Sequence, residues 1–72
     1  MMRRLSQADH EQVLEFLLPE REVNLFILGD IENFGYDFPE IPIWGDFDPA
    51  GRLRAVLLRF YDGLVFYSRG ED

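Results

Sequence analysis

The sequence has no cysteine and no lysine, and it contains a single histidine, His10. The absence of cysteine excludes disulfide bonds and thiolate metal sites in these 72 residues. One imidazole cannot form a histidine cluster, and no nucleophile stands at a suitable spacing from it, so we interpret His10 as a helix histidine and not as a general base. Domains shorter than about 70–80 residues usually need a disulfide, a metal or a partner chain. A partner chain is therefore the stabilising element that we expect here.

The sequence also lacks a long hydrophobic run. Its longest apolar stretch in the middle of the chain is Leu25–Leu28, far short of the roughly 20 residues that a membrane helix needs. The basic start Met1–Arg4 is not followed by an apolar core, as a signal peptide would be. We therefore expect a cytoplasmic protein with no membrane partner.

Positive charge is scarce, since fourteen acids face seven arginines and the formal net charge is −7. Nucleic acids and anionic membranes attract basic surfaces, so we expect neither as a partner. The composition, 47% hydrophobic and 15% aromatic, is that of a folded chain. We expect residues 1–72 to form one domain.

The first predicted helix begins after a short strand over Met1–Leu5. Ser6 and Asp9 have the spacing of a capping box, in which side chains satisfy free backbone N–H groups at a helix start. Pro19 ends the helix because it lacks an N–H donor. Between them an apolar stripe has helical period, and it consists of His10, Val13, Leu14, Leu17 and Leu18.

A second helix is predicted over Glu22–Phe34. Its apolar stripe consists of Val23, Ile27, Ile31 and Phe34, with Phe26 on one side. Gly29 in its middle costs about 1 kcal/mol relative to alanine, which indicates close packing or a kink. Gly35 is suited to a left-handed cap at the end of the helix.

Beyond residue 42 the pattern changes to strands. We predict strands over Ile43–Phe47, Leu53–Tyr61 and Leu64–Tyr67, joined by a turn at Asp48–Gly51 and a hairpin turn at Asp62-Gly63. In the longest strand, one face is predicted to carry Leu53, Ala55 and Leu57, and the other Arg54, Val56, Leu58 and Phe60. Both faces are largely apolar, which predicts a central strand covered on both sides. The fold class is therefore α+β, with a strand, two helices and then an antiparallel three-stranded meander.

Three groups of residues are candidates for chemistry. Asp46–Gly51 begins like a calcium loop, but Ala50 and Leu57 stand where oxygen ligands are needed, so we predict a turn and no metal site. An acidic group at the end of the second helix either attracts a cationic amine or is solvated surface; it consists of Asp30, Glu32 and Asp37. An aromatic group either lines a pocket or packs in the core and loops; it consists of Phe34, Tyr36, Phe38 and Trp44.

Three segments together resemble the GNAT superfamily of N-acetyltransferases. Met2–Asp9 is similar to the first strand and helix start of that family, and Glu22–Glu32 is similar to a second helix with an N-L-F-x-x-G-D run. Asp48–Val56 is similar to the hairpin of its second and third strands. The resemblance covers nearly the whole chain and implies the amino-terminal half of the GNAT fold.

The resemblance implies acetyl-CoA as the cofactor of the full fold, bound by an [RQ]-x-x-G-x-[GA] loop after the fourth strand. That run does not occur in these residues, so no cofactor-binding or catalytic residue is assigned to this chain. In the family the first two helices help to shape the cleft for the acceptor amine. By that analogy the candidate acceptor-side residues are Glu22, Asn24, Phe26, Asp30 and Asn33.

Two hypotheses follow. The chain is either the amino-terminal segment of a GNAT-like N-acetyltransferase, inactive alone, or a small acidic interaction module without catalysis. The partner is a missing carboxy-terminal half in the first case and a second copy of the chain in the second. Both hypotheses predict that the isolated chain self-associates, because the last strand would lie at an open sheet edge.

Overall fold

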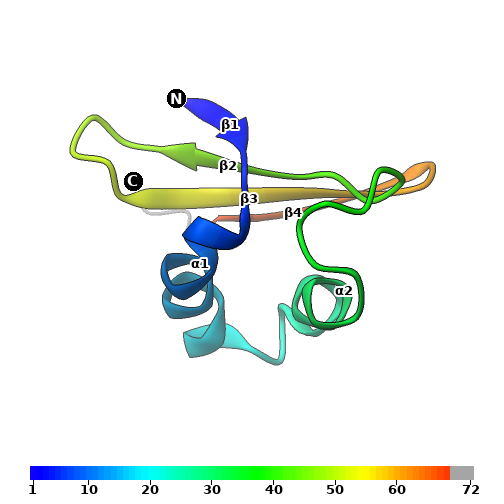
Figure 1. Ribbon diagram of the computed structural model, residues 1–72. Coiled ribbons are helices and arrows are strands. Elements are labelled where there is room, and N and C mark those ends of the chain that lie inside the picture. The colour runs from blue at the N-terminus through cyan, green and yellow to red at the C-terminus, as the bar shows by residue number, and fades with distance from the viewer. Residues whose placement is uncertain (69–72) are drawn as a thin grey trace.

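The computed structural model describes residues 1–68 as a layer of helices packed against one face of an antiparallel sheet (Figure 1). The four strands are β1 (Met2–Arg4), β2 (Ile43–Phe47), β3 (Leu53–Phe60) and β4 (Gly63–Ser68), hydrogen-bonded in the order β1-β2-β3-β4. The helices are α1 (His10–Leu17) and α2 (Leu25–Phe34). These elements confirm the α+β class and the order of elements expected from the sequence. No helix within residues 1–68 has the length and apolar content needed to cross a bilayer.

The chain enters α1 through a short 3₁₀ turn, η1 (Gln7–Asp9), where the predicted capping residues meet. The Ser6 backbone N–H donates to the Asp9 carboxylate at 2.9 Å. Arg3 donates to both oxygens of the same carboxylate, at 2.9 and 3.0 Å, and lies 4.3 Å from the Phe47 ring centroid. These contacts hold the pKa of Asp9 below its usual value. They also fix the helix start to the first strand and to β2.

The link between the helices is longer than predicted. α1 ends at Leu17 and Pro19 lies in a second 3₁₀ turn, η2 (Leu18–Glu20), which confirms the proline as the stop. α2 begins at Leu25 and not at Glu22, because Asn24 turns its side chain toward α1 and donates to the Leu17 carbonyl at 3.0 Å. The predicted stripe is wrong at its first position: Val23 is 71% exposed, whereas Asn24 is buried.

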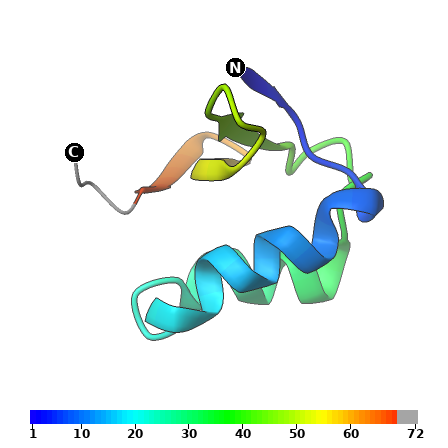
Figure 2. The ribbon, with the colours of Figure 1, turned by 90° about the vertical axis from the view of Figure 1, so that its left-hand side faces the viewer.

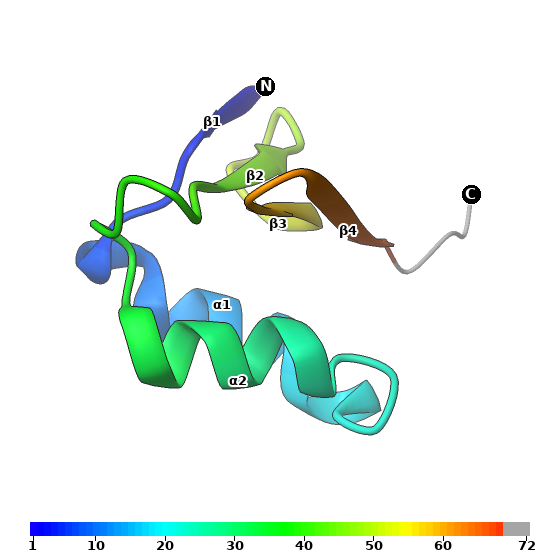
Figure 3. The ribbon, with the colours of Figure 1, turned by 90° about the vertical axis from the view of Figure 1, so that its right-hand side faces the viewer.

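A β-bulge changes the faces of β3. Asp46 pairs with Ala55 and Phe47 with Leu53, so Arg54 is the extra residue and the alternation restarts there. Leu53 therefore joins Val56 and Leu58 on the inner face, and the predicted grouping of Leu53 with Ala55 and Leu57 is wrong. β3 is central, as predicted, but within residues 1–68 the helices cover one face of the sheet only (Figures 2 and 3).

The first of the two predicted hairpin turns is confirmed, and the second is shifted by one residue. At Asp48–Gly51 the Asp48 carboxylate accepts from the Ala50 and Arg52 N–H groups, and Gly51 has a φ of +86°, which confirms the turn. The second turn lies one residue earlier than predicted, at Tyr61-Asp62, since Phe60 pairs with Gly63. Tyr61 has a positive φ of 55°, which is uncommon for a residue other than glycine, asparagine or aspartate.

The core lies between the inner sheet face and the helices. Eight fully buried aliphatic side chains come from the β1–α1 segment, α2, the sheet and the connection to β2; they are Leu5, Val13, Leu17, Ile27, Ile41, Ile43, Val56 and Leu58. Gly45 on β2 belongs to this face. A Cβ there would come within 2.8 Å of both Leu5 Cδ2 and Leu53 Cδ1, so the missing side chain is what admits the two leucines.

Two glycine-to-alanine changes therefore have opposite expected effects. We expect Gly45→Ala to lower the free energy of unfolding by about 1–3 kcal/mol, because it overpacks the core. Gly29 has nothing within 4 Å of its Cβ position and an ordinary helical φ, so it is not there for close packing. Gly29→Ala should raise the free energy of unfolding by about 0.5–1 kcal/mol. Urea denaturation of both variants measures this, and equal stabilities would contradict the packing at Gly45.

Candidate functional site

Asp30 is the buried acid of α2. It is 7% exposed, and its Oδ2 atom has no hydrogen-bond partner within residues 1–68. Burial raises the pKa of Asp30 above its usual value. Buried polar atoms are nearly always paired, so an orphaned carboxylate oxygen requires a specific explanation. This is the most unusual polar group in the described part of the chain.

Two pairs of aromatic rings flank Asp30. Phe26 and Phe34 lie one helical turn before and after it, on the same side of α2. The Phe26 ring packs edge-to-face on Phe60 of β3 with 5.6 Å between centroids, and the Phe34 ring lies 4.9 Å from Phe38. Phe26 is 51% exposed and Phe34 is 38% exposed, so both rings are partly open to solvent.

The structure divides the five predicted acceptor-side residues. Phe26, Asp30 and Asn33 lie at i, i+4 and i+7 on one side of α2. Asn24 is buried and its amide is used to bind the Leu17 carbonyl, which is a structural role. Glu22 precedes the helix in the exposed link. The sequence argument placed Phe34 and Phe38 in an aromatic group but did not connect them with Asp30, and it missed Phe60, which lies far along the chain from Phe26.

The acidic group predicted at the end of α2 does not form one surface. Glu32 is two residues from Asp30 and so lies on the opposite side of the helix. Glu32 and Asp37 are both exposed. Within residues 1–68 no three His, Cys, Asp or Glu side chains are grouped so that they could hold a metal ion. Asp30 therefore does not form a shared acidic surface with Glu32 and Asp37.

His10 pairs with Tyr36 across 26 residues of sequence. Its Nδ1 lies 2.8 Å from the Tyr36 hydroxyl, and the rings meet edge-to-face. Burial, with the nearby charge of Asp9, raises the pKa of Tyr36 to about 12, so the hydroxyl in this hydrogen bond keeps its proton. The pair joins α1 to the loop after α2, as expected for a packing histidine.

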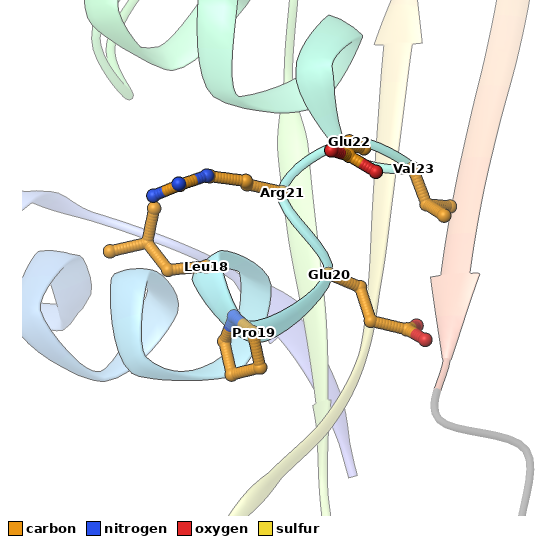
Figure 4. Close-up of a pocket in the computed structure, with 6 residues that line it drawn as sticks. All are labelled: Leu18, Pro19, Glu20, Arg21, Glu22 and Val23. Atoms are coloured by element: carbon orange, nitrogen blue, oxygen red, sulfur yellow. The ribbon is translucent and has the colours of Figure 1, made fainter.

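The link between the helices forms a hollow of about 410 Å³ (Figure 4). It is lined by Leu18, Pro19, Glu20, Arg21, Glu22 and Val23. The Glu20 carboxylate points away toward the sheet in Figure 4, where it accepts from the Tyr67 hydroxyl at 2.6 Å. A second hollow of about 430 Å³ between α1 and α2 is mainly aliphatic, with His10 and Glu32 at its rim. Neither hollow contains an orphaned buried polar atom.

The outer face of the sheet carries a row of apolar side chains. Trp44, Leu57 and Phe66 stand directly opposite one another across β2, β3 and β4. Phe66 is 61% exposed and Leu64, on the next row, is 67% exposed. No helix in the described residues lies over this row (Figure 3). Trp44, predicted with the aromatics near α2, belongs to this face instead.

Charge is divided between the two layers. The helices and 3₁₀ turns carry six acids and no arginine, whereas the strands carry four arginines and one aspartate. The aspartate, Asp46, is paired with Arg54 at 2.9 Å and with the amino terminus at 3.0 Å. The helical layer is thus acidic and the sheet is cationic, although the net charge is negative.

Comparison of the chain with known protein families, with curated proteins and with solved structures finds no match. The interpretation of the surfaces described above therefore depends on their geometry and on the sequence resemblance.

We expect Asp30→Asn to stabilise the protein at pH 7. A carboxyl group whose pKa is raised by folding contributes stability below its unfolded pKa of about 3.9, and this is lost as the pH rises through the folded pKa. Removing the charge should therefore raise Tm at pH 7. For a domain of this size, about 1 kcal/mol of added stability corresponds to a rise of roughly 4–8 °C. At pH 3 the substitution should change Tm little. Calorimetric scans at both pH values measure the difference, and a lower Tm at pH 7 would contradict it.

Proposed function

We propose that this chain is the amino-terminal half of a GNAT-like N-acetyltransferase and supplies the side of the fold that receives the acceptor amine. The transfer of an acetyl group then depends on a further segment that binds acetyl-CoA. The chain alone has no catalytic residue in this proposal.

The order of the elements supports this proposal. A helix pair lies between the first two strands, and four antiparallel strands follow one another in chain order. That is the arrangement the resemblance implies for the first half of the family fold. The helix with the N-L-F-x-x-G-D run is α2, which carries Asp30 and Phe26 beside the sheet.

The edge strand β4 supports the need for a further segment. In a hairpin with a two-residue loop, the pair next to the loop exchanges backbone hydrogen bonds, and the following pairs alternate. Leu64 and Phe66 fall in the pairs that do not exchange bonds, so their N–H and C=O groups point to the free edge. The sheet can therefore be extended beyond β4 without disturbing β3.

Calorimetry with acetyl-CoA tests the proposal. We expect no binding to the isolated chain, because the residues contain no [RQ]-x-x-G-x-[GA] run whose backbone N–H groups could hold the pyrophosphate. A chimera that continues after Ser68 into the carboxy-terminal half of a GNAT enzyme should bind acetyl-CoA. Saturable binding by the 72 residues alone would contradict the proposal.

A second candidate function is a homo-oligomerising interaction module without catalysis. The observation that favours it is the row Trp44, Leu57 and Phe66, an apolar strip on the outer sheet face that ends at an open edge. β4 contains no charged residue to block pairing with another strand. In this case the partner of the edge is β4 of a second copy.

Backbone substitution at the edge tests self-association. Leu64→Pro removes an N–H that points away from β3, so the fold is retained but a second strand cannot pair there. We expect sedimentation to show a dimer for the native chain, a monomer for Leu64→Pro and a weaker dimer for the control Leu64→Ala. A native chain that stays monomeric at millimolar concentration would contradict the homo-oligomer.

A further inference from the structure

We propose that Asp30 and the two flanking aromatic pairs, Phe26–Phe60 and Phe34–Phe38, form a binding site for an organic primary ammonium ion. This inference rests on the proposed function only where it identifies the ligand as the acceptor amine; the site itself rests on the burial and the missing partner of the carboxylate.

The missing partner defines the charge of the ligand. The Oδ2 atom of Asp30 accepts no hydrogen bond within residues 1–68, and the arginines that form ion pairs there use Asp9, Asp46 and Asp48. A buried carboxylate needs a cation that also donates hydrogen bonds. The ammonium group supplies three such donors.

The surroundings define the rest of the ligand. The ring faces of phenylalanine attract cations within about 6 Å and offer an apolar wall to a carbon stem. Phe26 and Phe34 are partly exposed and lie one helical turn before and after Asp30, so in this proposal a stem lies along them and reaches solvent. A metal ion fits poorly, since Asp30 belongs to no group of three His, Cys, Asp or Glu side chains among residues 1–68.

The charge of the helical layer favours the same class of ligand. Every charged side chain on α1, α2 and the two 3₁₀ turns is an acid. These acids include Glu11, Glu15 and Glu32, and all three are exposed. A negative surface raises the local concentration of small cations and has the opposite effect on carboxylate or phosphate ligands.

The test is an NMR titration of the isotopically labelled chain with n-butylammonium chloride, with n-butanol and sodium chloride as neutral and ionic-strength controls. We expect saturable shifts of the amide signals of residues 26–34 and of Phe60 with n-butylammonium only. Equal shifts with n-butanol would show an apolar hollow without a cation site and would overturn the proposal. Shifts with sodium chloride of the same size would overturn it as well.

Three variants assign the effect to Asp30. Asp30→Asn should weaken n-butylammonium binding by at least about tenfold, since it removes a charged acceptor, while its Tm without ligand rises. Glu32→Gln is the matched control on the opposite side of α2 and should change the affinity less than twofold. Phe26→Leu keeps the carboxylate and removes one ring, which should weaken binding roughly two- to fivefold. Unchanged binding by Asp30→Asn, or a loss with Glu32→Gln, would overturn the site.

The outcome is separable from that of the proposed function. Binding of n-butylammonium is measured on the isolated chain, without acetyl-CoA. If the amine binds through Asp30 and the chimera does not bind acetyl-CoA, the site stands and the acetyltransferase proposal fails. If the chimera transfers acetyl groups and Asp30→Asn leaves the KM for the amine unchanged, the proposed function stands and this site fails.

Discussion

The contact between the helices and the inner face of the sheet holds the two layers of this molecule together. Leu5 enters the space left by Gly45, and Val13 and Leu17 of α1 pack toward the same face. Both helices pack against the inner face of the sheet through their buried apolar side chains. Within residues 1–68 no helix therefore covers the outer sheet face. The apolar row of Trp44, Leu57 and Phe66, of which Phe66 is 61% exposed, is thus a consequence of how the core is built. The edge at β4 is open because no fifth strand pairs with it in residues 1–68.

The parts of the fold that depend on local chemistry could be predicted from the sequence. The Ser6–Asp9 box, the stop at Pro19 and the turn at Asp48–Gly51 all act within a few residues, and the structure has each of them. The bulge at Arg54 could not be predicted in this way, because it is a property of the pairing between β2 and β3. The start of α2 failed for a related reason: the Asn24 side chain satisfies a carbonyl of the preceding helix, so the apolar Val23 is left outside.

The candidate site was predictable in part. The resemblance directed attention to α2 and so to Phe26 and Asp30, but it gave no reason to separate them from Asn24 or Glu22. Acids at such positions are usually solvated, which is why the burial of Asp30 was not expected. A signal was present in the sequence, since Phe26, Asp30 and Phe34 repeat at intervals of four and place an acid between two aromatic residues on one helix side. What the sequence could not show is that Phe60 packs on Phe26 and Phe38 on Phe34.

The division of charge limits how copies of this chain can associate. Contact between the acidic helical layer of one copy and the cationic sheet of another is electrostatically favourable, but it is a head-to-tail contact and leads to open-ended chains unless the rotation closes. A two-fold contact through β4 is self-closing, and it places no like charges opposite one another because β4 has none. A two-fold contact through β4 would also extend the apolar row into the second copy. Leu64 and Phe66 have their backbone N–H and C=O groups at the free edge and their side chains on the outer face. Charge and symmetry therefore favour β4 as the place where two copies pair. It is also the strand beyond which the sheet would continue under the proposed function.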